Sequence, residues 1–418
     1  PKFNTTAASF PRDSLHDYLG IPPTVTDLDV TSLYGRAYNL IWNEWFRDQN
    51  LQDSLTVSKG DGPDTIATYN TLQRRGKRHD YFTSALPWAQ KGTSVDIPLG
   101  TEAPVILDST VTDYGRMVLT NGTQNNTAEA IYKNVGSTNN SAIYGNTTTV
   151  NYKYDPNATL IADLTSATAA TINQLRQAFQ IQRLYERDAR GGTRYTEIIQ
   201  SHFGVSSPDQ RLQRPEYLGG GSSPMNVNPI AQTSSTDATS PQGNLAAMGT
   251  CTLNNHGFTK SFTEHCLIIG LVNVRADLTY QQGVERRFSR STRWDFFWPG
   301  LANVGEQALL NQEIYAQGTS ADEDVFGYQE RYAEYRYKPS IITSSMRSSA
   351  VTSLDTWHLS QDFAALPSLN ASFIEDNPPI DRISAVASEP HILFDSYFKL
   401  TCARPMPTYG VPGMIDHF

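Results

Sequence analysis

The sequence is poor in the features that define membrane, secreted and disulfide-bonded proteins. Its 418 residues contain no apolar run of about 18 or more, and the first residues lack the charge, apolar stretch and cleavage site of a signal peptide. The chain has three scattered cysteines, Cys251, Cys266 and Cys402. They are too few for a disulfide framework and fit a reducing compartment. These absences argue against membrane insertion and indicate a globular protein.

Enzyme motifs are also missing. We find no GxSxG elbow, P-loop, HExxH, GxGxxG after a strand, or His/Cys cluster at metal spacing. Five dispersed histidines are interpreted as hydrogen-bonded structural residues: His79, His202, His256, His265 and His358. The triplet Asp322-Glu323-Asp324 lacks the further ligands of a calcium loop, so we interpret it as a solvated loop. The sequence predicts no catalytic residue, no metal site and no cofactor.

Positive charge is concentrated in two segments that also carry aromatic residues. The formal net charge of −9 argues against a protein that coats nucleic acid over its whole surface. Such segments can hold phosphates and stack the bases of a single strand, but they can also form solvated turns or salt bridges between subunits. The sequence leaves these interpretations open. The cations are Arg74, Arg75, Lys77 and Arg78 in the first segment, and Arg286, Arg287, Arg290 and Arg293 in the second.

Apolar residues at helical spacing predict four helices, which begin near residues 13, 32, 171 and 195. In the second, we expect Trp42 and Trp45 to pack in a core and Arg36 to lie on the opposite, polar side. The fourth should bury Phe203 and end at Gly204.

Three segments favour strands. Residues 265–275 are β-rich and apolar, as in a strand covered on both faces, so Cys266 should be a small buried hydrophobe. Residues 331–338 and 392–402 alternate in the manner of half-buried strands. The tract 215–249 shows no period and predicts a surface excursion or subunit-contact arm. Long strands separated by long excursions predict a mainly β, antiparallel jelly-roll fold with long loop insertions and a few short helices.

A polar tract from 101 to 170, rich in Asn, Thr, Ser, Ala and Gly, is interpreted as an insertion of hairpins and loops. The expected organisation is therefore 1–100, the insertion 101–170, and 171–418. Five Asn-x-Ser/Thr triplets lie in the tract and are either glycosylation sites of a secreted protein or chance matches. They begin at Asn121, Asn125, Asn139, Asn146 and Asn157.

Several motifs resemble those of the major capsid proteins of gokushoviruses, small tailless phages of the Microviridae. They are collinear and spread over most of the chain. The motifs are AYNLIWN at 37–43, RGKRHDYFTS at 75–84, LYERDARGGTRY at 184–195, RPEYLGG at 214–220, FGYQERYAEYRY at 326–337 and CARPMP at 402–407.

The resemblance implies an eight-stranded antiparallel jelly roll that assembles into a T=1 icosahedral shell around circular single-stranded DNA. The insertion would form a protrusion at the threefold axes and meet a host receptor through residues such as Asn121, Asn139 and Asn146. Further implied partners are a small basic DNA-binding protein, a DNA-pilot protein and a scaffold. The implied location is the virion, with assembly in the host bacterial cytoplasm. Family members carry early jelly-roll strands before the region like 13–23, and we expect such a segment to precede this chain.

The alternative is a jelly-roll protein that binds or cleaves carbohydrate, suggested by frequent Tyr and Trp and by long loops. Cleavage would require two carboxylates roughly 5 to 9 Å apart. The sequence does not supply that distance.

Overall fold

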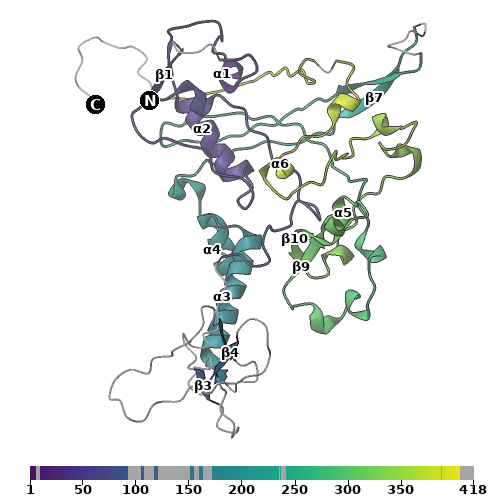
Figure 1. Ribbon diagram of the computed structural model, residues 1–418. Helices are drawn as coiled ribbons and strands as arrows, with labels where there is room; N and C mark the ends of the chain where they lie inside the picture. Colours follow the sequence, from purple (N-terminus) through teal and green to yellow (C-terminus); the bar gives the residue numbers. More distant parts are fainter. Residues whose placement is uncertain are drawn as a thin grey trace, which may run out of the picture. The chain divides into compact units, whose positions relative to one another are not determined.

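The computed structural model describes residues 1–5, 10–92, 172–234, 236, 242–386 and 388–404, with four short strands between residues 105 and 162 (Figure 1). The chain divides into two compact units. The first consists of Pro1–Ala89 and Val205–Phe418, and the second of Gln90–Gly204. The expected insertion 101–170 falls in the second unit, and most of it lies outside the described residues.

The N-terminal part of the first unit contains the two expected helices. Helix α1 (Leu15–Tyr18) is followed by Gly20, whose φ of 87° favours glycine at the turn that ends the helix. Helix α2 (Leu33–Ile41) continues as a π-helical turn over Trp42–Phe46. Beside them, strand β1 (Lys2–Asn4) pairs antiparallel with β2 (Asp29–Thr31).

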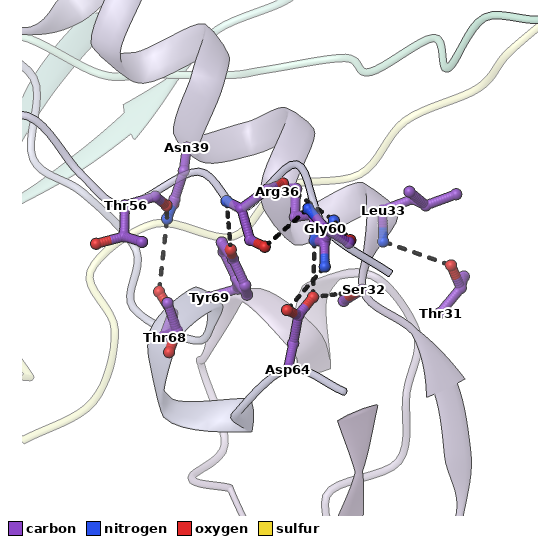
Figure 2. Close-up of polar contacts among 11 residues, drawn as sticks. Thr31, Ser32, Leu33, Arg36, Asn39, Thr56, Gly60, Asp64, Thr68 and Tyr69 are labelled. Carbon is purple, nitrogen blue, oxygen red and sulfur yellow. Dashed lines mark hydrogen bonds and ion pairs between the residues drawn. The ribbon is translucent and has the colours of Figure 1, made fainter. Parts of the chain in front are cut away.

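The buried face of α2 includes Arg36, unlike the expected one. Figure 2 shows the polar contacts of this residue. This side chain is buried because Asp64 accepts from Nε at 2.7 Å and from Nη2 at 2.8 Å. Its remaining nitrogen donates to the carbonyls of Ser58 and Gly60 at 3.0 and 2.8 Å, and Ser32 donates its hydroxyl to Asp64. The placement of Arg36 on a polar, outward side was therefore wrong, because a loop supplies enough acceptors to bury the guanidinium.

The two tryptophans of this helix have different roles. Trp42 is buried, as expected, and its indole donates to the carbonyl of Arg74 at 3.3 Å. Trp45 is 43% exposed and lies under the guanidinium of Arg214, 4.1 Å from ring centroid to Cζ. Its Nε1 donates to the carbonyl of Pro215 at 2.9 Å. The second ring therefore holds a distant segment against the helix instead of filling a core.

The main core of the first unit surrounds a two-stranded antiparallel sheet. Strand β9 (Glu306–Leu310) pairs with β10 (Val325–Glu330), with an irregularity between Val325 and Gly327, and α5 (Asn311–Ile314) follows β9 directly. Helix α6 (Ala371–Ile374) contributes Phe373. The core consists of Tyr81, Phe82, Ala85, Leu309, Ile314, Phe326, Ala333 and Phe373.

The tract 215–249 contains a hairpin that its sequence did not predict. Strand β7 (Asn226–Ala231) pairs antiparallel with β8 (Leu245–Thr250), and this hairpin extends away from the other labelled elements of its unit in Figure 1. Every β7 residue is exposed, which explains why no apolar alternation marks it.

None of the three segments expected as strands pairs in a sheet of the described chain. Residues 265–275 and 392–402 have no strand assignment in the described chain, and most of their side chains, including that of Cys266, are exposed. Their β-rich composition cannot create a ladder without a hydrogen-bonded neighbour. Residues 331–338 form a turn, because Tyr332 adopts a φ of 65° and Ala333–Tyr335 follows as a 3-10 turn.

The second unit contains the other two expected helices, α3 (Ile172–Gly191) and α4 (Tyr195–Phe203). Gly204 ends α4 with a φ of 68°, as expected, but Phe203 is 75% exposed, so its predicted burial was wrong. The two helices are joined by a 2.6 Å contact between His202 Nε2 and Asp188 Oδ1.

Four short strands of the second unit form two antiparallel pairs. Strand β3 (Val105–Leu107) pairs with β6 (Leu160–Ala162), and β4 (Met117–Thr120) pairs with β5 (Asn151–Tyr154). The described chain is thus mostly loops and short antiparallel strands with a few helices. Among the described helices, none has the length and apolar character required to span a membrane.

Candidate functional site

The second basic segment lies against the core, and its first arginine is tied to a buried carboxylate. Arg286 Nη1 donates to Glu313 Oε1 at 2.9 Å and to the carbonyl of Ala308 at 2.7 Å. Glu313 also accepts from the Tyr81 hydroxyl at 2.8 Å and from the backbone N–H of Leu310 at 3.1 Å. Burial raises the pKa of the Glu313 carboxyl, and Arg286 acts against this shift. The charge of Arg286 is therefore matched within the chain.

Arg290 is also enclosed. Its guanidinium lies 3.4 Å from Glu334 Oε1, with side-chain exposures of 12% for the arginine and 7% for the glutamate. The Cζ atom is 4.5 Å from the ring centroid of Tyr335 and 5.3 Å from that of Phe296. Gln307 Nε2 donates to the other oxygen of Glu334 at 3.1 Å. An ion pair and two aromatic faces stabilise the cation, while its buried Nε has no hydrogen-bond partner in the described residues.

The other two arginines of this segment remain at the surface. Arg287 is half exposed, pairs with Glu285 at 2.9 Å and lies over Phe288 with Cζ at 4.8 Å from the ring centroid. Arg293 lies over Trp294 at 4.1 Å. No ion pair of Arg293 occurs within the described chain. Of the four predicted cations, it has the guanidinium best placed to meet another molecule.

The first basic segment holds two distant parts of the first unit together. Arg74 donates to Asn377 Oδ1 at 2.7 Å and Arg75 to Asn273 Oδ1 at 3.2 Å. Arg78 pairs with Asp277 at 2.6 Å, with both side chains exposed. The exposed pair is worth little in free energy, but these contacts fix where the segment runs.

Lys77, in the same basic segment, is buried against α6. Its ammonium lies 4.2 Å from the centroid of the Phe373 ring, and its backbone N–H donates to the carbonyl of Ile374 at 2.7 Å. Burial lowers the pKa of the Lys77 amine to about 8. Burial also raises the pKa of the nearby Asp376 carboxyl. A lysine enclosed in this way is poorly placed to hold a phosphate.

The aromatic residues that follow the first basic segment belong to the core and not to an open groove. Tyr81 and Phe82 are 6% and 4% exposed. Asp80 shapes their turn, since its Oδ1 accepts from the N–H groups of Phe82 and Thr83 at 2.8 Å each. Tyr280 donates its hydroxyl to the other oxygen at 3.0 Å. Neither buried ring is available to stack a base.

The acidic triplet closes a loop through backbone contacts. Asp322 accepts from the backbone N–H groups of Gln317 at 2.9 Å, Gly318 at 2.6 Å and Thr319 at 3.3 Å. In the parts of the chain that are described, no three His, Cys, Asp or Glu side chains gather as a metal site would require. The carboxylate of Asp322, which belongs to the 3-10 turn Ser320–Glu323, thus caps the start of that turn.

Two buried carboxylates that organise the second segment, Glu313 and Glu334, were missed by the sequence analysis. The sequence did contain a signal for them, because each glutamate is next in sequence to an apolar residue of the core. Such an acid needs a cation partner. The predicted host-contact residues Asn121, Asn139 and Asn146 lie outside the described residues.

The arrangement as a whole fits a structural protein. Its polar groups tie segments of the chain together, and large apolar side chains stay exposed along its extended segments. Comparison with known sequences then gives the family. The sequence model of the family described as Capsid protein (F protein) matches residues 1–414, and the chain belongs to this family of phage capsid proteins.

Three relatives share the name Capsid protein VP1. That of Bdellovibrio phage phiMH2K is 50% identical over 426 residues, which cover 100% of this chain and 79% of the relative. Those of Chlamydia phage 1 and Spiroplasma virus 4 are 42% and 39% identical, with coverage of 99% and 96% of this chain and 79% and 76% of the relatives. The expected gokushovirus resemblance is confirmed. The chain is a structural protein of the virion, not an enzyme, and the carbohydrate-cleaving alternative is set aside.

Proposed function

We propose that many copies of this chain close into a T=1 icosahedral shell around circular single-stranded DNA. The observation that carries the proposal is the match to the capsid protein family over residues 1–414. Exposed side chains of the β7–β8 hairpin support it, since Val227, Ile230 and Met248 are 48%, 53% and 58% exposed. Apolar surface of this kind is normally covered by a partner. Many modest contacts in a closed, symmetric shell add up to a persistent particle.

Within each subunit of the shell, the proposed fold is an eight-stranded antiparallel jelly roll. The segments 251–278 and 388–404 support it, because their residues favour strands and their apolar side chains are exposed. Pairing with further strands would satisfy their backbone groups and cover these side chains. A hydrogen-exchange measurement on assembled particles tests this point. Strong protection of both segments is expected, and rapid exchange in the particle would contradict it.

In the proposed organisation, residues 1–100 and 171–418 form the shell. The insertion 101–170 forms a protrusion at the threefold axes that contacts the host. The polar composition of the insertion supports an exposed role. Deleting residues 121–151, which include Asn121, Asn139 and Asn146, should leave shells intact and lower adsorption to cells. Loss of all assembly would instead show that the insertion is needed for contacts between subunits.

The charge of the chain supports separate basic partners. A net charge of −9 per subunit cannot neutralise packaged DNA. A small basic DNA-binding protein would supply the missing cations, beside the proposed pilot protein, scaffold and host receptor. Assembly would take place in the host bacterial cytoplasm.

Electron microscopy tests the central proposal. The chain is produced with its phage partners and the purified material is imaged. Closed particles of uniform diameter that contain DNA are the expected result. Only free subunits or irregular aggregates, after co-expression with all partners, would refute the shell.

A further inference from the structure

Four exposed aromatic residues lie within five positions directly after the second basic segment. Trp294, Phe296, Phe297 and Trp298 are 49%, 52%, 53% and 45% exposed. We call these four residues the aromatic surface. The rings of Trp294 and Trp298 lie 5.8 Å apart between centroids. Such a concentration of half-exposed large rings marks a surface for recognition.

The aromatic surface is held rigidly although it is exposed. Trp298 Nε1 donates to the carbonyl of Arg293 at 2.8 Å, and the backbone N–H of Trp298 donates to the Tyr332 hydroxyl at 3.2 Å. The same hydroxyl donates to the carbonyl of Phe296 at 3.2 Å. The Phe297 ring packs on Tyr332 with centroids 5.1 Å apart. A surface fixed in advance loses little conformational freedom on binding.

A carboxylate also shapes the turn that presents these rings. Asp295 Oδ2 accepts from the N–H groups of Ser291 and Thr292 at 3.0 and 2.7 Å, and from the Thr292 hydroxyl at 2.9 Å. These hydrogen bonds hold the pKa of the Asp295 carboxyl below its usual range. The turn therefore places a fixed negative charge within the aromatic surface.

The charge around the aromatic surface is balanced. Arg286 and Arg290 are paired with Glu313 and Glu334, and Arg287 is paired with Glu285. Arg293 forms no ion pair in the described residues, but the carboxylate of Asp295 keeps the numbers of basic and acidic side chains around the surface equal, at four each. A polyanion requires a net basic surface, which this segment does not offer. Tryptophan, phenylalanine and arginine with matched charges are instead the residues that dominate the energetics of protein interfaces.

We propose that the aromatic surface packs against a second copy of this chain and not against DNA. The inference rests on the proposed shell, in which every subunit meets several others. A self-neutralised aromatic patch suits contact with an apolar patch of a neighbouring subunit, as in a heterologous interface. Trp294 and Trp298 would be the central contacts, with Arg293 closing the edge through its stack on Trp294.

The test compares matched tryptophan variants in the full chain, produced with its phage partners. One variant carries Trp294→Ser and Trp298→Ser, and a second carries Trp294→Ser alone, which keeps the hydrogen bond of Trp298 to Arg293. The control is Trp357→Ser, since Trp357 is 57% exposed and lies elsewhere, in the 3-10 turn Asp355–Trp357. Circular dichroism and urea unfolding first establish which variants fold.

Particle yield is measured by sedimentation, and binding of an oligothymidylate to free subunits by fluorescence anisotropy. We expect each folded variant of the aromatic surface to lose at least about tenfold in particle yield, with unchanged DNA binding and a normal control. A folded Trp294→Ser variant that assembles like the parent overturns the proposal. Weaker DNA binding with normal assembly also overturns it and identifies a base-stacking surface. If the parent itself forms no particles, the proposed shell fails, which is a different result.

Discussion

The replacement Arg286→Ala separates a structural role of this arginine from a role in binding DNA. It leaves the Glu313 carboxylate, whose side chain is 3% exposed, without its cation. Removing one partner of a buried pair costs about 3 to 5 kcal/mol. The loss has an upper limit, because the carboxyl can take up a proton. Keeping a glutamic acid with a pKa near 4.3 protonated at pH 7 costs about 3.7 kcal/mol. We therefore expect the free energy of unfolding to fall by about 3 kcal/mol at pH 7.

The same reasoning gives the pH dependence of Arg286→Ala. Burial already raises the pKa of the Glu313 carboxyl, and loss of the guanidinium raises this pKa further. The folded state then holds more protons than the unfolded state between the two pKa values, so the free energy of unfolding decreases as the pH rises. At pH 5 protonation costs only about 1 kcal/mol. The destabilisation relative to the parent should thus grow from about 1 kcal/mol at pH 5 to about 3 kcal/mol at pH 7.

The assay is urea unfolding of the purified coat protein at both pH values, followed by tryptophan fluorescence. Adding Glu313→Gln to Arg286→Ala should recover most of the loss at pH 7, since the amide oxygen can accept from the Leu310 N–H, the amide nitrogen can donate to the Tyr81 hydroxyl, and no cation is needed. Arg287→Ala is the control, because its side chain is 52% exposed, and it should change the free energy by less than about 0.5 kcal/mol. An Arg286→Ala protein that unfolds like the parent but packages less DNA would refute the structural role.

Three further predictions concern positions outside this pair. Asp64→Asn should lower the melting temperature at neutral pH, because it removes the ion pair with Arg36. Arg36 lowers the pKa of the Asp64 carboxyl, so the parent loses this stabilisation as the pH falls through that pKa. Melting curves recorded at several pH values should show this loss in the parent and not in the variant. Gly283→Ala should prevent normal folding, since a Cβ there would overlap the α5 backbone, whereas Gly300→Ala meets open space and should melt like the parent. Ile314→Ala should cost about 2 to 5 kcal/mol in urea unfolding, because the side chain is fully buried.

The helices were predictable because their signals are local. Glycine in the left-handed region ends α4 at Gly204, where the sequence indicated, and Gly20 follows α1 in the same conformation. Strands depend on a partner that the sequence of one segment does not name. Residues 265–275 have the composition of a buried strand and no ladder in the described chain, whereas β7 is a strand without an apolar pattern. Composition alone therefore predicted neither the missing ladder of residues 265–275 nor the strand β7.

The two basic segments could be located in the sequence, but the partners of their cations could not be found from spacing. Arg290 pairs with Glu334, 44 positions later, and Arg78 pairs with Asp277, 199 positions later. Arg36 shows the same limitation in a helix, since the acceptors that allow its burial come from a loop 22 to 28 positions away. A charge pattern locates cations, while only the fold shows which of them are already neutralised.

The ion pairs of these arginines limit how strongly the capsid protein can attract the phosphates of its genome. In a shell of acidic subunits, cations paired to buried carboxylates add nothing to the attraction for phosphate. Arg286 and Arg290 belong to this group, so replacing them should disturb the subunit before it disturbs DNA packaging. Packaging would then depend on cations supplied by other molecules. Particle DNA content should consequently respond to salt and to the supply of a basic partner more strongly than to Arg290→Ala, provided that the altered subunit still folds.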